Sequence, residues 1–151
     1  MATKTKTRKT IKREKITNDA PRTFTDADFP VGTVAHQGDL ILIRLASLPA
    51  GAKPRKDRQL AVGSTQGSRH VLTKGDAFDC DIPAVIAAIG AVCHGIKVTP
   101  SYIGPVFETV KGVADLTHPE HGNHCYRGDM TIGVVYQRNL DSEERERRTI
   151  D

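Results

Sequence analysis

Short apolar runs separated by turn residues are the feature of this chain that most constrains its fold. Between residues 31 and 138 each run spans only a few positions, and glycine-containing turns interrupt the runs at regular spacing. This pattern is typical of an antiparallel sandwich or a small barrel. We therefore predict a mainly β fold, a compact antiparallel sandwich or small barrel with one short helix.

Leu40–Leu45 is the strongest strand candidate, because its nearly continuous apolar sequence indicates burial on both faces. Further strands are expected at residues 31–36, 59–62, 69–73 and 130–137. Residues 106–110 and 113–116 are predicted to form a hairpin around Lys111-Gly112. The segments 48–57 and 116–125 are predicted to be loops.

Residues 81–93 depart from the strand pattern and predict the one helix. Asp81 is a suitable N-cap, Pro83 falls in the first turn, and several alanines follow. Val85, Ile86 and Ile89 would then share one face. Gly90 weakens the helix, and residues 91–98 could equally form a strand.

Positive charge is concentrated at the N-terminus. Residues 1–23 carry eight basic and two acidic side chains, a net charge of +6, whereas residues 24–138 carry eleven of each. We therefore predict a flexible basic arm (1–30), a β-rich domain (31–138) and a charged C-terminal tail (139–151). The arm could contact nucleic-acid phosphates through Lys4, Lys6, Arg8, Lys9, Lys12, Arg13 and Lys15. Alternatively, it is only a disordered, solubilising tail.

A second basic cluster lies at residues 53–58, within a predicted surface loop. Together with the arm it would offer two points of contact to a polyanion. The chain has only three tyrosines and no tryptophan. Aromatic side chains that could stack on single-stranded bases are therefore scarce, and phosphate contact without base recognition is the expected mode.

The cysteines and the hydropathy indicate a cytoplasmic protein, or a virion component if the gene belongs to a phage. Cys80, Cys93 and Cys125 form an odd set with no C-x-x-C pair, which argues against a disulfide framework. No stretch approaches the roughly 18 apolar residues of a membrane span. The basic N-terminus lacks the apolar segment of a secretory signal, so no membrane partner is expected.

The densest group of chemically versatile side chains is the run 116–125. His118, His121 and His124 are spaced three apart, but Pro119 and Gly122 argue against a helix. In a loop the three histidines could wrap one zinc ion, with His70 or Cys125 completing a tetrahedral shell. The zinc hydrolase pattern H-E-x-x-H is absent. The alternative is a polar loop in which His118 or His121 hydrogen-bonds the backbone and stabilises a turn.

Two catalytic arrangements remain open. Glu120, with His70, could act as a general base on metal-bound water, as in a small metal-dependent hydrolase. Cys125 could instead use a distant histidine such as His70 as a nucleophilic pair, although an isolated cysteine more often serves packing.

The Gly/Ser-rich segment 63–67 could cradle an anion with its backbone N–H groups, or simply form a wide turn. It leads directly into Arg69 and His70. If the neighbouring strands bring these two residues close to the loop 118–124, the two segments form one polar site. This convergence is the first hypothesis to test.

Several segments together resemble small β-rich proteins of unassigned function in bacterial and phage genomes. The resemblance covers residues 37–138 and rests on short segments: Gln37-Gly38-Asp39, Gly67-Ser68-Arg69-His70, residues 116–121 and residues 134–138. It implies no activity, but it favours pairing of the strand at His70 with the loop 118–121.

The absence of a catalytic signature and the balanced charge of the β-body favour a non-enzymatic binding or structural protein. The β-body would dock to a protein partner or assembly, and the arm would contact nucleic acid or a neighbouring subunit. A small metal-dependent enzyme that uses the histidine cluster is the alternative.

Overall fold

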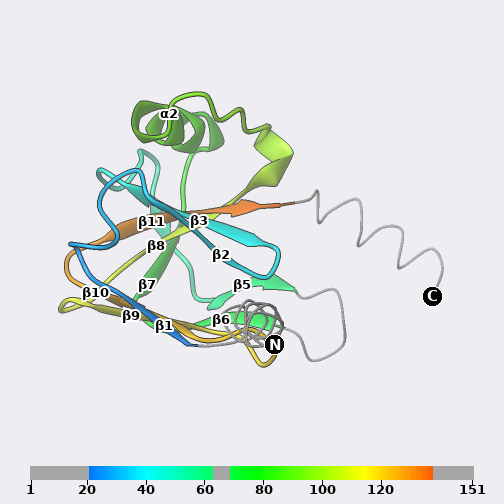
Figure 1. The fold of residues 1–151 in the computed structure, drawn as a ribbon. Coiled ribbons are helices and arrows are strands. Elements are labelled where there is room, and N and C mark those ends of the chain that lie inside the picture. Colours follow the sequence, from blue (N-terminus) through cyan, green and yellow to red (C-terminus); the bar gives the residue numbers. More distant parts are fainter. Residues whose placement is uncertain (1–20, 63–68, 138–151) are drawn as a thin grey trace, which may run out of the picture.

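The computed structural model of the chain describes residues 21–62 and 69–137, which form three stacked layers (Figure 1). Helix α2 lies on one face of a six-stranded sheet, and a five-stranded sheet lies on the other face. The elements are β1 (Arg22–Phe24), β2 (Val34–Gln37), β3 (Leu40–Leu45), β4 (Lys53–Pro54), β5 (Gln59–Val62), β6 (Arg69–Lys74), β7 (Asp76–Asp79), α2 (Ile82–Val92), the 3-10 turn η1 (Pro100–Tyr102), β8 (Ile103–Glu108), β9 (Val113–Thr117), β10 (His124–Arg127) and β11 (Thr131–Tyr136).

The strand order is β1-β10-β9-β6-β5 in one sheet and β2-β3-β11-β8-β7-β4 in the other. All pairings are antiparallel except that of β1 with β10, which is parallel. The two sheets pack face to face as a sandwich rather than closing into a barrel. The predicted fold class, mainly β with one short helix, is confirmed.

Two apolar cores separate the three layers. One lies between the sheets and includes Phe29, Leu42 and Tyr126, while the other lies beneath α2 and includes Ile43 and Val85. Strand β3 contributes alternate side chains to both cores, because successive residues of a strand point to opposite faces. The predicted burial of Leu40–Leu45 on both faces is therefore confirmed.

Helix α2 follows the sequence prediction closely. Asp81 occupies the N-cap position without a side-chain capping bond, Pro83 lies in the first turn, and Val85 and Ile89 are buried against the sheet. Residues 93–98 contain no strand, so the alternative of a strand over 91–98 is wrong.

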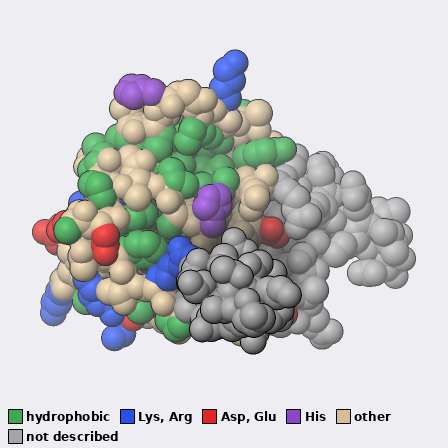
Figure 2. All heavy atoms as spheres, viewed as in Figure 1, with side chains coloured by type: hydrophobic (Ala, Val, Ile, Leu, Met, Phe, Trp, Pro, Cys, Tyr) green, Lys and Arg blue, Asp and Glu red, His purple; other side chains and the backbone are tan. Residues whose placement is uncertain are grey.

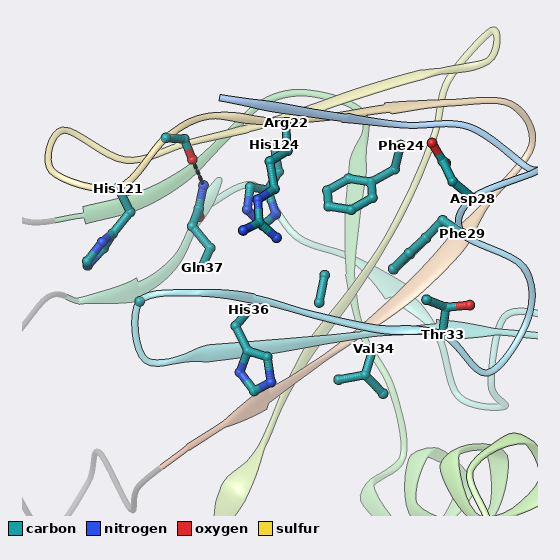
Figure 3. A pocket seen from close by; sticks show the side chains of 13 residues that line it. Arg22, Phe24, Asp28, Phe29, Thr33, Val34, His36, Gln37, His121 and His124 are labelled. Carbon is teal, nitrogen blue, oxygen red and sulfur yellow. Dashed lines mark hydrogen bonds between the residues drawn. The ribbon is translucent and has the colours of Figure 1, made fainter. Parts of the chain in front are cut away.

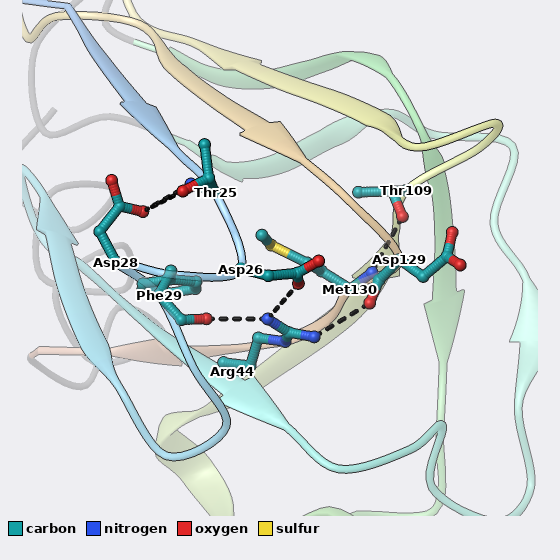
Figure 4. Close-up of polar contacts among 8 residues, drawn as sticks. All are labelled: Thr25, Asp26, Asp28, Phe29, Arg44, Thr109, Asp129 and Met130. Atoms are coloured by element: carbon teal, nitrogen blue, oxygen red, sulfur yellow. Dashed lines mark hydrogen bonds and ion pairs between the residues drawn. The ribbon is translucent and has the colours of Figure 1, made fainter.

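The β-body begins before residue 31, so the predicted boundary of the arm is wrong. Strand β1 pairs with β10, and Phe29 is fully buried in the core between the sheets. Figure 4 shows how Arg44 secures this segment: its Nη1 donates to Asp26 Oδ1 at 2.8 Å and to the Phe29 carbonyl at 2.9 Å. Its Nη2 donates to the Asp129 carbonyl at 3.0 Å. The remainder of the arm, residues 1–20, and the tail from residue 138 lie outside the described residues.

The predicted hairpin over residues 106–116 is also wrong. The expected turn is present, with positive φ at Lys111 (53°) and Gly112 (78°), but only an isolated bridge between Val110 and Val113 forms around it. Strand β8 belongs to the six-stranded sheet and β9 to the five-stranded sheet. The turn therefore carries the chain from one sheet to the other.

Smaller differences concern strand ends and short strands. The first predicted strand begins at Val34 rather than Val31, and β4 and β7 occur where no strand was expected. Strand β10 begins at His124, inside the segment 116–125 that was predicted to be a loop, so that prediction is wrong at its end. Within residues 21–62 and 69–137, the structure contains no helix that is long and apolar enough to cross a membrane.

Candidate functional site at the open side of the sandwich

Three histidines from distant segments lie together at one end of the five-stranded sheet. Strand β6 pairs with β9, which brings His70 beside the loop that follows β9. The ring centroids of His70 and His118 are 4.4 Å apart, and those of His118 and His121 are 4.5 Å apart. His70 and His118 are buried. The predicted convergence is confirmed for His70, while Arg69 is exposed.

Gln37 joins this histidine cluster to the loop. Its Nε2 donates to the carbonyl oxygens of Leu116 and Gly122, each at 3.0 Å. Its Oε1 lies 3.0 Å from Nδ1 of His70. Since the amide oxygen can only accept, His70 must carry its proton on Nδ1. Gln37 is not among the site residues predicted from the sequence. Its signal is that Gln37 alternates with Ala35 on the inward face of β2, where a polar side chain requires partners.

His118 stabilises the turn of the loop 118–123. Its Nδ1 accepts hydrogen bonds from the backbone N–H groups of Glu120 and His121, both at 3.0 Å. This confirms the structural alternative, in which a histidine of the run bonds the backbone.

Gly38 leaves room for the ring of His121. A Cβ built at position 38 would lie 2.7 Å from Cδ2 and 2.8 Å from Nε2 of His121. The φ angle of Gly38 is 57°, which also disfavours larger residues. A side chain at position 38 would therefore displace His121.

His124 belongs to a different environment from the other histidines of the run. Its Nδ1 lies 3.1 Å from the hydroxyl of Tyr126, and its ring packs edge-on against Phe24 with centroids 5.2 Å apart. Among the residues that the structure describes, no group of three or more His, Cys, Asp or Glu side chains is placed to hold a metal ion. The zinc site at His118, His121 and His124 thus gains no support and stays a prediction.

Burial keeps these imidazoles neutral at pH 7. It lowers the pKa of His70 to about 3, with further lowering by the neighbouring His118 and His121. Burial, followed by His121, lowers the pKa of His118. Burial, followed by the charge of Arg22, lowers the pKa of His124 to about 4. His70, His118 and His124 are therefore polar but uncharged groups near physiological pH.

These shifts predict loss of stability in mild acid. A histidine in the unfolded chain has a pKa near 6.5, well above the values of about 3 for His70 and about 4 for His124 in the fold. The unfolded chain therefore takes up protons first as the pH falls. The contribution of each residue is complete above about pH 6.5 and is lost as the pH falls toward the folded pKa. Urea unfolding at pH 7.5 and pH 5 should show a decrease of about 2 kcal/mol per histidine.

The matched variants are His124→Gln and His94→Gln, because His94 is exposed. The first should flatten the pH dependence and the second should leave it unchanged. A stability that stays constant between pH 7.5 and pH 5 would contradict this account.

A cavity of about 840 Å³ opens beside the cluster, between the edge strands of the two sheets. Figure 3 shows Arg22, Phe24 and His124 on the side of β1 and β10, facing β2 across the opening. Phe29 and Asp28 lie at one end. The cavity thus combines an aromatic wall with a polar rim. On the face shown in Figure 2, hydrophobic side chains gather between α2 and the five-stranded sheet.

The three cysteines do not join this site. Cys125 points to the outer face of the five-stranded sheet, opposite Asp115, whereas His70 points inward. Burial raises the pKa of the Cys125 thiol, so a Cys125–His70 nucleophilic pair is wrong. Glu120 is exposed in the loop. Cys93 is buried and Cys80 packs beneath α2, as expected of structural cysteines.

The second basic cluster is partly engaged within the fold. Arg55 forms ion pairs with Asp79 at 3.0 Å and Asp57 at 3.8 Å. Arg58 donates to the carbonyl oxygens of Leu72 and Gly75. The basic residues from Lys4 to Lys15, which were predicted to contact nucleic acid, lie outside the described residues. The Gly/Ser-rich segment 63–67 also lies outside them.

Comparisons with curated proteins and with solved structures found no match to this chain. A family model does match, over residues 36–129, which is more than half of the chain. The matched region contains Gln37 and all four histidines discussed above. The chain therefore belongs to the family described as a domain of unknown function, DUF8820.

Proposed function

We propose that this protein is a non-enzymatic binding or assembly protein. Its β-body docks to a protein partner through the open side of the sandwich, and its basic N-terminal segment contacts nucleic acid or a neighbouring subunit. A cytoplasmic setting, or a virion if the gene belongs to a phage, is part of this proposal. The cysteines support it, because all three are free thiols.

The observation that carries the proposal is the cavity of about 840 Å³ at the edges of both sheets. Ligand sites in proteins are typically concave and mostly apolar, with a few polar groups that orient the ligand. Here Phe24 and Phe29 supply apolar wall, and Arg22 and His124 supply polar groups. The cavity also opens between strand edges, where a protein segment can approach the backbone.

The bonding of the histidine cluster favours binding over catalysis. Nδ1 of His70 is engaged by Gln37, and Nδ1 of His118 accepts two backbone N–H groups. These bonds fix the loop and the end of β2 that border the cavity. The cluster then serves to hold the rim of a binding site in shape.

Metal analysis of the purified full chain tests this proposal against the metal-dependent enzyme. We expect sub-stoichiometric zinc and a melting temperature that does not change when EDTA is added. Stoichiometric zinc that is lost in the double variant His118→Ala/His121→Ala, together with chelator-sensitive stability, would contradict the proposal. The matched control is His36→Ala/His94→Ala, which replaces two exposed histidines.

Deleting residues 2–20 tests the role of the basic segment. These residues carry seven basic and two acidic side chains, and the deletion leaves β1 intact. Double-stranded DNA or RNA should bind the full chain with a log–log salt slope of about −4 to −6. The deletion variant should lose this binding in fluorescence anisotropy.

The control for this experiment is Lys53→Gln/Lys56→Gln, which removes two exposed cations from the body. It should change the salt slope by about 2 at most. Equal binding by the full chain and the deletion variant, or no binding by either, would contradict a nucleic-acid role for the segment.

A further inference from the structure

The outer edge of β2 pairs with no other strand among the described residues, and it borders the cavity. Strand β2 is the first strand in the order of the six-stranded sheet and pairs only with β3 among the described strands. The opposite edge strand, β4, is short and carries Lys53 and Pro54, which are features that discourage edge pairing. Strand β2 (Val-Ala-His-Gln) contains neither a proline nor a lysine.

Two residues of β2 direct their backbone groups away from the sheet. The Arg44 N–H donates to the Thr33 carbonyl at 3.0 Å. Thr33, the residue directly before β2, therefore directs its carbonyl toward β3. Hydrogen-bonded pairs alternate along an antiparallel ladder, so Ala35 and Gln37 bond β3. The N–H and C=O groups of Val34 and His36 therefore point outward. Outside the strand ladders, neither residue has a hydrogen bond to another described residue.

The side chains of β2 define two faces for any strand added to this edge. Ala35 points between the sheets, toward the cavity, and is 6% exposed. Val34 and His36 point to the opposite face and are exposed, as Figure 3 shows for both side chains. A residue added opposite Ala35 would direct its side chain into the cavity, beside Phe24 and Phe29.

The aromatic wall of the cavity favours one of two occupants of this edge. If a second copy of the chain paired its own β2 symmetrically, it would present only Ala35 to the cavity of about 840 Å³. A segment with a large apolar side chain at that position would place that side chain in the cavity against Phe24 and Phe29. In strand addition the main-chain hydrogen bonds give affinity and a pocket for a side chain gives specificity. Burial of a large apolar side chain adds to that affinity.

We propose that the free edge of β2 binds an extended segment of a protein partner by strand addition, with one large apolar side chain of that segment in the cavity. The inference rests on the proposed binding function and specifies its ligand. Main-chain groups of Val34 and His36 bond the segment. The flanking side chains of the segment lie on the outer face, beside Val34.

A selection experiment with matched variants tests the inference. A phage-displayed library of random dodecapeptides is selected on the immobilised full chain, and enriched peptides are measured by fluorescence anisotropy. His36→Pro removes one outward N–H without removing a bond to β3, and proline is tolerated at a strand edge. His36→Gln is the matched control, because it changes the side chain and keeps the N–H. Ala35→Leu adds bulk on the inward face of β2, where the side chain of the bound segment would enter the cavity.

We expect enriched peptides to share one large apolar residue between β-branched residues. They should bind His36→Pro and Ala35→Leu at least tenfold more weakly than the unmodified chain, and bind His36→Gln equally well. Replacing the shared apolar residue of the peptide with alanine should weaken binding about tenfold. Circular dichroism should show that each variant is folded.

Three results would overturn the inference. The first is a selection that yields no peptide, or peptides that bind His36→Pro and Ala35→Leu as tightly as the unmodified chain. The second is a dimer in sedimentation experiments that dissociates on the His36→Pro change, because the occupant would then be a second copy. The third is faster exchange of the Val34 and His36 amides after deletion of residues 2–20, because the chain's own N-terminal segment would then cover the edge. Chelator-sensitive stability would instead contradict the proposed function itself.

Discussion

Replacing Phe29 with alanine is expected to lower the free energy of unfolding by about 3–5 kcal/mol. Phe29 is fully buried, and its ring packs against Phe24 and Tyr126 with centroids 5.0 and 5.5 Å away. The substitution removes an aromatic side chain from the core between the sheets and leaves a cavity. Urea denaturation of the full chain measures the loss.

Val31→Ala is the matched control, because Val31 lies two residues further along and is 48% exposed. We expect it to change the stability by about 0.5 kcal/mol or less. Equal and small effects of the two substitutions would show that residues 21–30 are not part of the folded body.

Replacing Gln37 with methionine is expected to cost about 3 kcal/mol or more, although methionine has nearly the same shape. The substitution leaves the carbonyls of Leu116 and Gly122 and Nδ1 of His70 without the partner that Gln37 provides. Each buried polar group that loses its partner costs about 1–3 kcal/mol. The change should also loosen the loop 118–123, which can be followed by hydrogen exchange.

His36→Met is the control for this substitution. It introduces the same side chain one residue earlier, on the exposed face of β2, and should alter the stability by about 0.5 kcal/mol or less. If Gln37→Met were equally mild, the amide of Gln37 would not hold the histidine cluster together.

Short stretches of sequence were sufficient to predict the strands, helix and turn that are determined by neighbouring residues. The nearly continuous apolar sequence of Leu40–Leu45 predicted the burial of β3 on both faces, and Asp81 with Pro83 located the start of α2. The turn at Lys111-Gly112 was likewise correct. Each of these features depends on neighbouring residues, so one segment of sequence carries the information.

The errors concern contacts between distant segments. Strand β1 has three residues in a basic context, and its partner β10 lies far along the chain. The strands on either side of Lys111 have the composition of a hairpin, but β8 and β9 find partners in different sheets. Strand composition alone does not specify partners, because pairing depends on the packing of the whole sandwich.

The candidate site was predicted in part. The approach of His70 to the loop 118–121 was expected, and the bond from the loop backbone to His118 was one of two alternatives. Gln37, Gly38 and the cavity were missed, because their roles depend on how β2 meets β1 and the histidine loop. The available signal was that Gln37 lies two residues after Ala35, on the same inward face of β2.

Amide hydrogen exchange along β2 shows whether this edge is free to bind. In the ¹⁵N-labelled full chain at a concentration where it is monomeric, the amides of Val34 and His36 should exchange rapidly. Those of Ala35 and Gln37, which bond β3, should exchange slowly. Slow exchange at all four positions would show that the edge is already covered and would contradict the account.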